Sequence, residues 1–351
     1  MDRPKGPLHN NSEGLGRYLG ITILNKTNSD KPADRLYHFT FPVVNNDAFG
    51  TTFQGFLDGD LNPLSSAEAN TGVNSGGTTV TWSTESKTVF SSDGNVAVTI
   101  GDMSANNIGI RRYDLSSGTL SADIPPQFEA SNYSDPGTPD SRTSLIVGIG
   151  RNGSEQKIYA GIMSRFPASD AEGGTRPYPA VTVSTDNGVT WSSLDILPVS
   201  VVRAYATANG ANPDSTLFPY NQAQDVFVTG TDEYSFIMNM FEVNADRTDG
   251  NELRQLVEVY HNSNGWGIRK IADISGIIFT FDPIAPATTR ANQVANEAHV
   301  SVTADGKFYL VKWVEIVNIM MDQDINGDGN TPDTLQTSDV FVTGRPSTST
   351  N

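Results

Sequence analysis

The sequence contains no cysteine among its 351 residues. Disulfide bonds, thiolate metal sites and cysteine nucleophiles are therefore excluded together. Long apolar runs are also missing, because no stretch approaches the roughly 18 to 20 residues that a membrane-spanning helix needs. Residues 1–7 lack the apolar segment of a signal peptide. We therefore expect no direct insertion into a membrane. Either the protein is cytoplasmic or the chain is a mature or trimmed form whose export signal lies outside this sequence.

Positive charge is scarce: 23 Lys and Arg stand against 40 Asp and Glu, a formal net charge of −17. The electrostatic field of so negative a chain repels nucleic acid and anionic lipid, so neither is an expected partner. An acidic surface suits solubility or the binding of divalent cations. Secreted proteins without disulfides are common in bacteria and unusual among animal ectodomains. The composition thus favours a bacterial protein.

Short apolar runs with a period of two are what the sequence does contain. β-branched and aromatic residues dominate these runs, which suits half-buried strands. The 32 Gly and 19 Pro gather in turn clusters between them. Helical spacing is nowhere sustained, and residues 291–298 are the one modest candidate. The sequence therefore predicts an all-β fold with strands at 36–41, 96–100, 144–149, 157–162, 225–229, 235–241 and 307–313.

Self-similar segments recur along the chain. Residues 181–196 are echoed by 257–274 and more weakly by 110–124, while 340–351 look like half of another copy and 36–53 like a degenerate one. The copies lie roughly 70 to 80 residues apart, which fits a four-stranded blade with insertions. About five units are visible, and about six are expected in full because a blade cannot bury its face alone. Either the chain belongs to a longer protein or its N-terminal strand completes the last blade.

One turn carries a more specific motif. Ser184, Asp186, Gly188 and Trp191 match the pattern S-x-D-x-G-x-x-W between two predicted strands. The pattern suits a hairpin, because Ser and Asp hydrogen-bond nearby backbone, Gly takes a positive φ and Trp packs between strands. The turn resembles the Asp-box (BNR repeat) of the sialidase-like β-propeller superfamily. Partial copies of the motif lie at residues 91–94, 261–266 and 303–306.

The resemblance implies a β-propeller of four-stranded antiparallel blades over residues 16–351, after an N-terminal extension at 1–15. In that family the Asp-box is a structural turn at the periphery of the blade, away from the catalytic face. The four motif residues are therefore expected to hold the fold rather than to act in catalysis.

A sialidase-type active site would need three arginines that clamp a carboxylate, a Tyr–Glu pair and an Asp acid. The Phe/Tyr-Arg-Ile-Pro stretch of such enzymes is absent. Arg111, Arg112, Arg142 and Arg203 lie near predicted strands and are either central-face residues or ordinary ion-pairing arginines. Catalytic residues stay unassigned.

An oxygen-rich segment near the C-terminus predicts a calcium site. Its oxygen ligands stand at every second residue, with an additional carboxylate further on and glycines that allow a sharp turn. One register begins at Asp322; the other begins at Asp324 and resembles dockerin or thrombospondin-type calcium loops. The alternative is an acidic turn without an ion. The predicted structural ligands are Asp322, Asp324, Asn326, Asp328, Asn330 and Asp333.

Together these features favour a secreted or cell-surface, non-catalytic β-propeller module that binds glycan or extracellular protein. The long polar segments 58–77, 130–142 and 166–179 offer variable binding surface. Two alternatives stay open. One is an exo-glycosidase of the sialidase type; the other is a structural subunit of an extracellular assembly, through self-assembly or as part of a larger chain.

Overall fold

The structure is a computed structural model. It describes residues 15–16, 20–45, 48–64, 68–69, 71–73, 79–91, 93–103, 107–123, 148–152, 157–164, 166, 178–218, 223–230, 232–242, 253–274, 298–303, 307–321 and 333–346.

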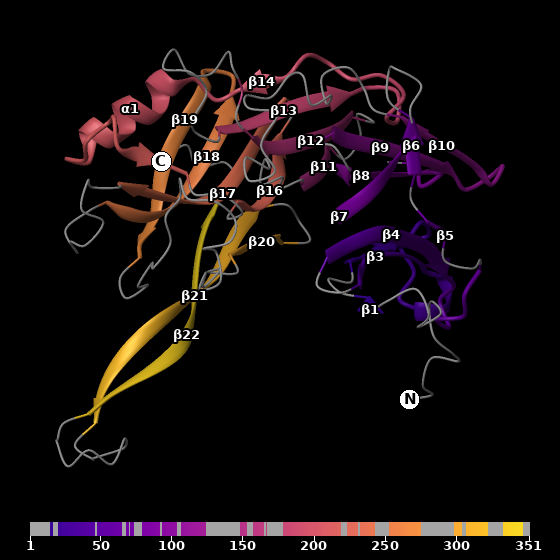
Figure 1. Cartoon of the computed structure of the whole chain (residues 1–351), viewed down its shortest axis with the longest axis horizontal. Coiled ribbons are helices and arrows are strands. Elements are labelled where there is room, and N and C mark those ends of the chain that lie inside the picture. Colours follow the sequence, from indigo (N-terminus) through magenta and orange to yellow (C-terminus); the bar gives the residue numbers. More distant parts are fainter. Residues whose placement is uncertain are drawn as a thin grey trace. The chain divides into compact units, whose positions relative to one another are not determined.

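Five antiparallel sheets follow one another along the chain, and strands adjacent in sequence are mostly neighbours in the sheet (Figure 1). The first sheet contains β1 (Leu15–Gly16), β2 (Gly20–Leu24), β3 (Leu36–Asn45), β4 (Ala48–Leu57) and β5 (Glu68–Ala69). The second contains β6 (Thr71–Val73), β7 (Thr79–Phe90), β8 (Val96–Met103), β9 (Asn107–Asp114) and β10 (Thr119–Asp123). The third contains β11 (Gly148–Asn152), β12 (Lys157–Ser164), β13 (Tyr178–Ser184) and β14 (Asp195–Ile196).

The fourth sheet contains β15 (Thr216–Leu217), β16 (Ala223–Gly230), β17 (Glu233–Glu242), β18 (Arg254–Asn262) and β19 (Gly265–Asp273). The fifth contains β20 (His299–Val302), β21 (Phe308–Met321) and β22 (Asp333–Pro346). The chain divides into two compact units, the first built on the first three sheets and the second on the last two.

Within each unit, successive sheets pack face to face. In the first unit, β7 contacts β2, β3 and β4 of the preceding sheet and β11 of the following one. Phe56, Phe90 and Ala97 form the apolar core between the first two sheets. In the second unit, the core between the last two sheets includes Phe227, Ile237, Leu256, Tyr309, Val311 and Trp313. Apolar side chains are therefore buried between the first and second sheets and between the fourth and fifth.

The period-two runs form strands as predicted. The predicted segments lie in β3, β8, β12, β16, β17 and β21, while most of 144–149 falls outside the described residues. The all-β prediction is confirmed for a mostly β chain of five sheets, which agrees with the about five units visible in the sequence. Closure into a ring of blades stays a prediction, as do the boundaries at residues 15 and 16.

The expectation that no helix is sustained is wrong at one place. Helix α1 (Val199–Ala208) connects β14 to β15 and buries Val202 and Ala206, one helical turn apart. Gly210 follows the helix with a φ of +76°, which ends it. The predicted helical candidate at 291–298 lies outside the described residues except for its last position. Among the described helices, none has the length and apolar character needed to cross a bilayer.

Candidate functional site

The turn between β13 and β14 is braced by its own side chains. The Asp186 Oδ1 accepts hydrogen bonds from the backbone N–H groups of Val189 and Thr190 at 3.1 and 2.8 Å. The Ser184 Oγ accepts the Gly188 N–H at 2.8 Å, where Gly188 has a φ of +84°. The Trp191 Nε1 donates to the Gly188 carbonyl at 3.2 Å. The four motif residues therefore form one continuous hydrogen-bonded turn.

The pKa of Asp186 follows from these contacts. Partial burial works to raise the pKa of this carboxyl, but hydrogen bonds from Thr190, Ser184 and Val189 outweigh it and hold the pKa below its ordinary value. Asp186 is consequently ionised at neutral pH and saturated with local donors. A carboxylate in this state has no proton to donate to a substrate.

The same turn joins the third sheet to the second. The Arg112 Nε, from β9, donates to the Asn187 carbonyl at 2.6 Å. Gly188 lies against the buried Val98 of β8, where an added Cβ would stand 3.1 Å from both methyl groups. Arg112 thus has a structural partner, and the turn locks two stacked sheets together.

Equivalent turns follow the next-to-last strand of three other sheets. After β4, the Asp58 Oδ1 accepts the N–H groups of Asp60 and Asn62; after β9, the Asp114 Oδ1 accepts those of Ser116 and Ser117. After β18, the Asn262 Oδ1 accepts the Asn264 N–H. A residue with positive φ lies within each turn, namely Leu61, Gly118, Asn187 with Gly188, and Gly265. Three of the self-similar segments, 110–124, 181–196 and 257–274, therefore occupy equivalent places in their sheets, whereas 36–53 lies in β3 and β4 and 340–346 lies in β22.

Two of the partial motif copies belong to a different turn. Ser91 and Val96 pair their backbones, and the Ser91 Oγ accepts the Val96 N–H at 2.9 Å. Thr303 and Phe308 repeat this pattern at 3.1 Å. These turns join β7 to β8 and β20 to β21 and do not follow the next-to-last strand of their sheets, so they are not equivalent to the turn at 184–191. The short S/T-x-D-G string suits tight hairpins generally, which is why the sequence grouped them together.

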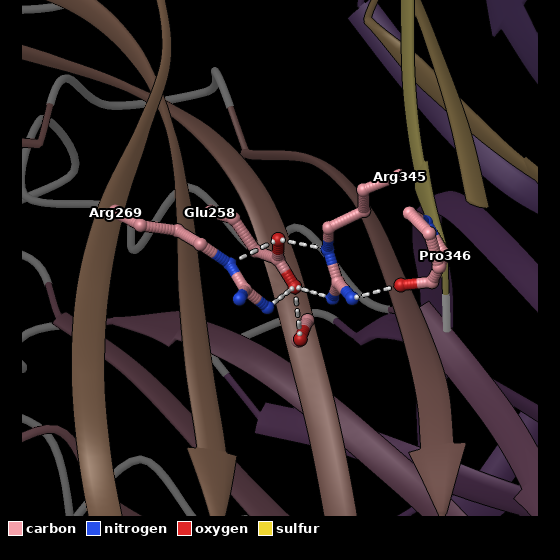
Figure 2. Close-up of polar contacts among 5 residues, drawn as sticks. Glu258, Arg269, Arg345 and Pro346 are labelled. Carbon is pink, nitrogen blue, oxygen red and sulfur yellow. Dashed lines mark hydrogen bonds and ion pairs between the residues drawn. The ribbon is translucent and has the colours of Figure 1, made fainter. Parts of the chain in front are cut away.

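A buried carboxylate in the second unit holds two arginines (Figure 2). Glu258 of β18 is 4% exposed, and both its oxygens accept from Arg269 of β19, at 2.7 and 2.9 Å. Arg345 of β22 donates to the same two oxygens at 3.2 and 2.7 Å, and the Ser235 hydroxyl adds a bond of 2.8 Å. Burial raises the pKa of Glu258, but the two guanidinium groups outweigh it and leave the pKa lowered.

The aromatic surroundings of this ion cluster complete it. Arg269 lies over the Tyr260 ring at 4.7 Å from its centroid, and Arg345 lies over the Tyr309 ring at 5.0 Å. Two stacked, doubly hydrogen-bonded guanidinium groups on one carboxylate are already satisfied. This pair of arginines therefore ties β22 to the fourth sheet and is not an open clamp for a ligand carboxylate.

A second buried polar group lies in the first unit. The Gln54 amide stands 3.0 Å from the His38 Nε2. With its nitrogen turned toward His38, its oxygen accepts from the Arg111 Nη2 and Nε at 3.2 and 3.3 Å. Burial lowers the pKa of His38 to about 4, and the positive charge of Arg111 acts in the same direction. His38 is therefore neutral at physiological pH.

The other predicted site residues are placed as follows. Arg203 on α1 forms an exposed ion pair with Asp214 at 3.1 Å. Arg142 and five of the six predicted calcium ligands lie outside the described residues, and Asp333 begins β22 opposite Met321. Within the described ranges, no group of three or more His, Asp or Glu residues is arranged to hold a metal ion. The calcium site stays a prediction.

A pocket of about 410 Å³ opens in the first unit, where turns of the first two sheets meet. Its walls come from the 3-10 helix η2 (Pro32–Asp34) and the segments after β2, β4, β7 and β9. Gly59 packs directly on Ala33, where an added Cβ would come within 2.3 Å of backbone atoms. Sequence reasoning missed this pocket, since the segments that form it are far apart in the chain.

No protein-family model matches the chain, and no curated protein matches it in sequence. Among solved structures, a polysaccharide lyase of family PL25, an ulvan lyase bound to -[GlcA(1-4)Rha3S]-, aligns at 12% identity over 90% of this chain and 68% of its own, with a TM-score of 0.44. The microbial sialidase Hz136 aligns at 12% identity over 82% and 52%, with a TM-score of 0.35. The NanB sialidase of Streptococcus pneumoniae aligns at 11% identity over 75% and 32%, with a TM-score of 0.37.

Proposed function

We propose that this chain is a non-catalytic module of the sialidase-like β-propeller type that binds glycan or extracellular protein. The architecture supports the propeller type in two ways. Successive meander sheets stack face to face within each unit, and one Asx-braced turn recurs after the next-to-last strand of four sheets. Repetition of a sheet with its turn is what a radial array of blades requires.

The partners of the arginines and the pKa values of the carboxyl groups support the proposal that the chain is non-catalytic. Arg112, Arg203, Arg269 and Arg345 all have structural partners. In the part of the chain that the structure describes, every carboxyl whose pKa is displaced has it lowered: Asp58, Asp93, Asp114, Asp186, Glu258 and Asp273. A glycosidase acid needs the opposite displacement, because it must stay protonated near neutral pH.

The test is incubation of the purified protein, with calcium present, with fluorogenic glycosides that include sialosides. We expect no release of fluorophore above a heat-denatured sample, and we expect retention on a glycan array. An active sialidase run beside it shows that the substrates are sound. Turnover that disappears in an arginine variant would establish the glycosidase alternative.

Secretion and the calcium site belong to the same proposal. A calcium ion at residues 322–333 would pin the connection between β21 and β22. We expect calcium to raise the melting temperature and a chelator to lower it. Asp324→Ala should abolish the calcium response, whereas Asp30→Ala, an exposed carboxylate elsewhere, should keep it. A melting temperature that ignores both calcium and chelator would contradict the site.

A further inference from the structure

The pocket in the first unit contains an arginine that the fold itself does not use. Arg35 lies directly after η2, and its backbone N–H bonds the Pro32 carbonyl. Its Nε is buried without any hydrogen-bond partner. Among the residues that the structure describes, none forms a side-chain hydrogen bond or an ion pair with the Arg35 guanidinium. A buried, unsatisfied donor destabilises a fold, so a residue of this kind indicates a role other than stability.

The neighbouring charged groups are already engaged, which leaves Arg35 available. Asp58 accepts two backbone N–H groups and the Asn62 side-chain amide. Asp34 accepts the Ser29 hydroxyl at 2.6 Å. Lys26 donates to the Asn95 Oδ1 at 2.6 Å. The two cations and two carboxylates all line the pocket, but only the guanidinium has no partner.

Part of the pocket lining is apolar. Leu24, Leu36 and Leu115 line the pocket, and all three pack against the core between the first two sheets. A volume of about 410 Å³ lies within the range of small-molecule sites. The pocket therefore combines an apolar surface, carboxylate acceptors and one planar cation with unused donors.

We infer that this pocket binds a saccharide that bears a single carboxylate or sulfate group, held by Arg35. The guanidinium offers Nε and an Nη in a fork that matches two oxygens of such an anion. Carboxylate oxygens of Asp34 accept hydroxyl donors, and the leucines contact the apolar face of a sugar ring. This inference rests on the proposed glycan-binding function and assigns it a site and a ligand class.

The charges of the pocket exclude a more highly charged ligand. Asp34 and Asp58 repel a polyphosphate or a nucleic-acid backbone, and the net charge of −17 adds to that repulsion. A saccharide with one anionic group and several hydroxyl groups fits this pocket, because Arg35 is the one available cation and the carboxylates of Asp34 and Asp58 are hydrogen-bond acceptors.

The test is calorimetric titration of the whole chain with glucuronate, glucose and inorganic sulfate. We expect glucuronate to bind, glucose to bind more weakly, and Arg35→Met to weaken glucuronate binding by roughly 10- to 100-fold, as loss of a charge-assisted hydrogen-bonded pair implies. Lys31→Ala is the matched control, since it removes the same charge from the same connection without lining the pocket. It should leave the affinity within about twofold of that of the unmodified chain.

Thermal unfolding separates a binding role from a structural one. Because the Arg35 Nε has no partner, Arg35→Met should keep or raise the melting temperature of the free protein while it removes binding. Arg35→Lys should keep the charge yet lose most of the affinity, because an ammonium lacks the fork.

Three results would overturn the site. Inorganic sulfate binding as tightly as glucuronate would reduce it to a simple anion site. Acidic glycans that bind equally to the unmodified chain and to Arg35→Met would place their site elsewhere, with the glycan-binding function intact. Failure of every acidic glycan to bind the unmodified chain would overturn both the pocket and glycan binding as the proposed function.

Discussion

Single Asp and Asn side chains set the turns of this chain. Asp58, Asp114, Asp186 and Asn262 each use one short side-chain oxygen to accept backbone N–H groups two to four residues ahead. The oxygen supplies the acceptor that a turning backbone lacks, and the following positive-φ residue completes the reversal. A carboxylate that accepts these backbone N–H groups stabilises the turn.

Removing the Asp186 carboxylate should destabilise the protein without affecting ligand binding. Asp186→Ala leaves the N–H groups of Val189 and Thr190 without their acceptor. We expect a loss of about 1–2 kcal/mol in the free energy of unfolding. Denaturant titration measures this, with Thr185→Ala, an exposed neighbour in the same turn, as the control. Equal effects of the two substitutions would contradict the role of Asp186.

Buried His38 should make stability depend on pH. Its pKa is about 4 in the fold and about 6.5 when unfolded, so below pH 6.5 the unfolded state binds more protons than the folded state. Stability is therefore lost as the pH falls from about 6.5 to 4, by up to about 3 kcal/mol. His38→Gln should flatten this part of the pH profile. His299→Gln, which changes an exposed histidine, should not; a profile unchanged by His38→Gln would refute the account.

At the scale of elements, contacts between distant strands decide how the sheets are joined. Glu258 and Arg345 are 87 residues apart in sequence, yet their bonds attach β22 to the fourth sheet. No local pattern encodes such a contact, and the same holds for the pocket around Arg35. These two features could not have been predicted from one sequence.

Local patterns, by contrast, did predict several of the longer strands, namely β3, β8, β12, β16, β17 and β21. β3 and β17 carry the alternation of a pleated strand, so their residues imply their structure. Helix α1 was missed because its only buried apolar positions are Val202 and Ala206, too short a stripe to stand out as a helical period. The turn at 184–191 was recognised because its side chains act within a few residues of one another.

Breaking the Glu258 cluster should release β22. Glu258→Ala leaves the Arg269 and Arg345 guanidinium groups without their carboxylate, which should cost about 3 kcal/mol because both are partly exposed and solvated. Amide hydrogen exchange should accelerate across residues 340–345 before it changes in the first sheet. Lys312→Ala, an exposed charge on the neighbouring strand β21, serves as the control. Uniform acceleration, or none, would show that the cluster does not tie β22 down.

At the scale of the whole molecule, a repeated turn and paired charged groups both stabilise the fold. Four of the five sheets reuse one turn, and the ionised groups that stabilise the sheets are already paired. We expect the net charge of −17 to disfavour strongly anionic partners.

The central claim, binding without turnover, is tested most directly by native mass spectrometry after overnight incubation with a uronic-acid-containing oligosaccharide. We expect a complex whose mass equals that of the protein plus the intact glycan, which Arg35→Met loses and Lys31→Ala keeps. Shortened or eliminated glycan products in the spectrum would contradict the claim and establish an enzyme.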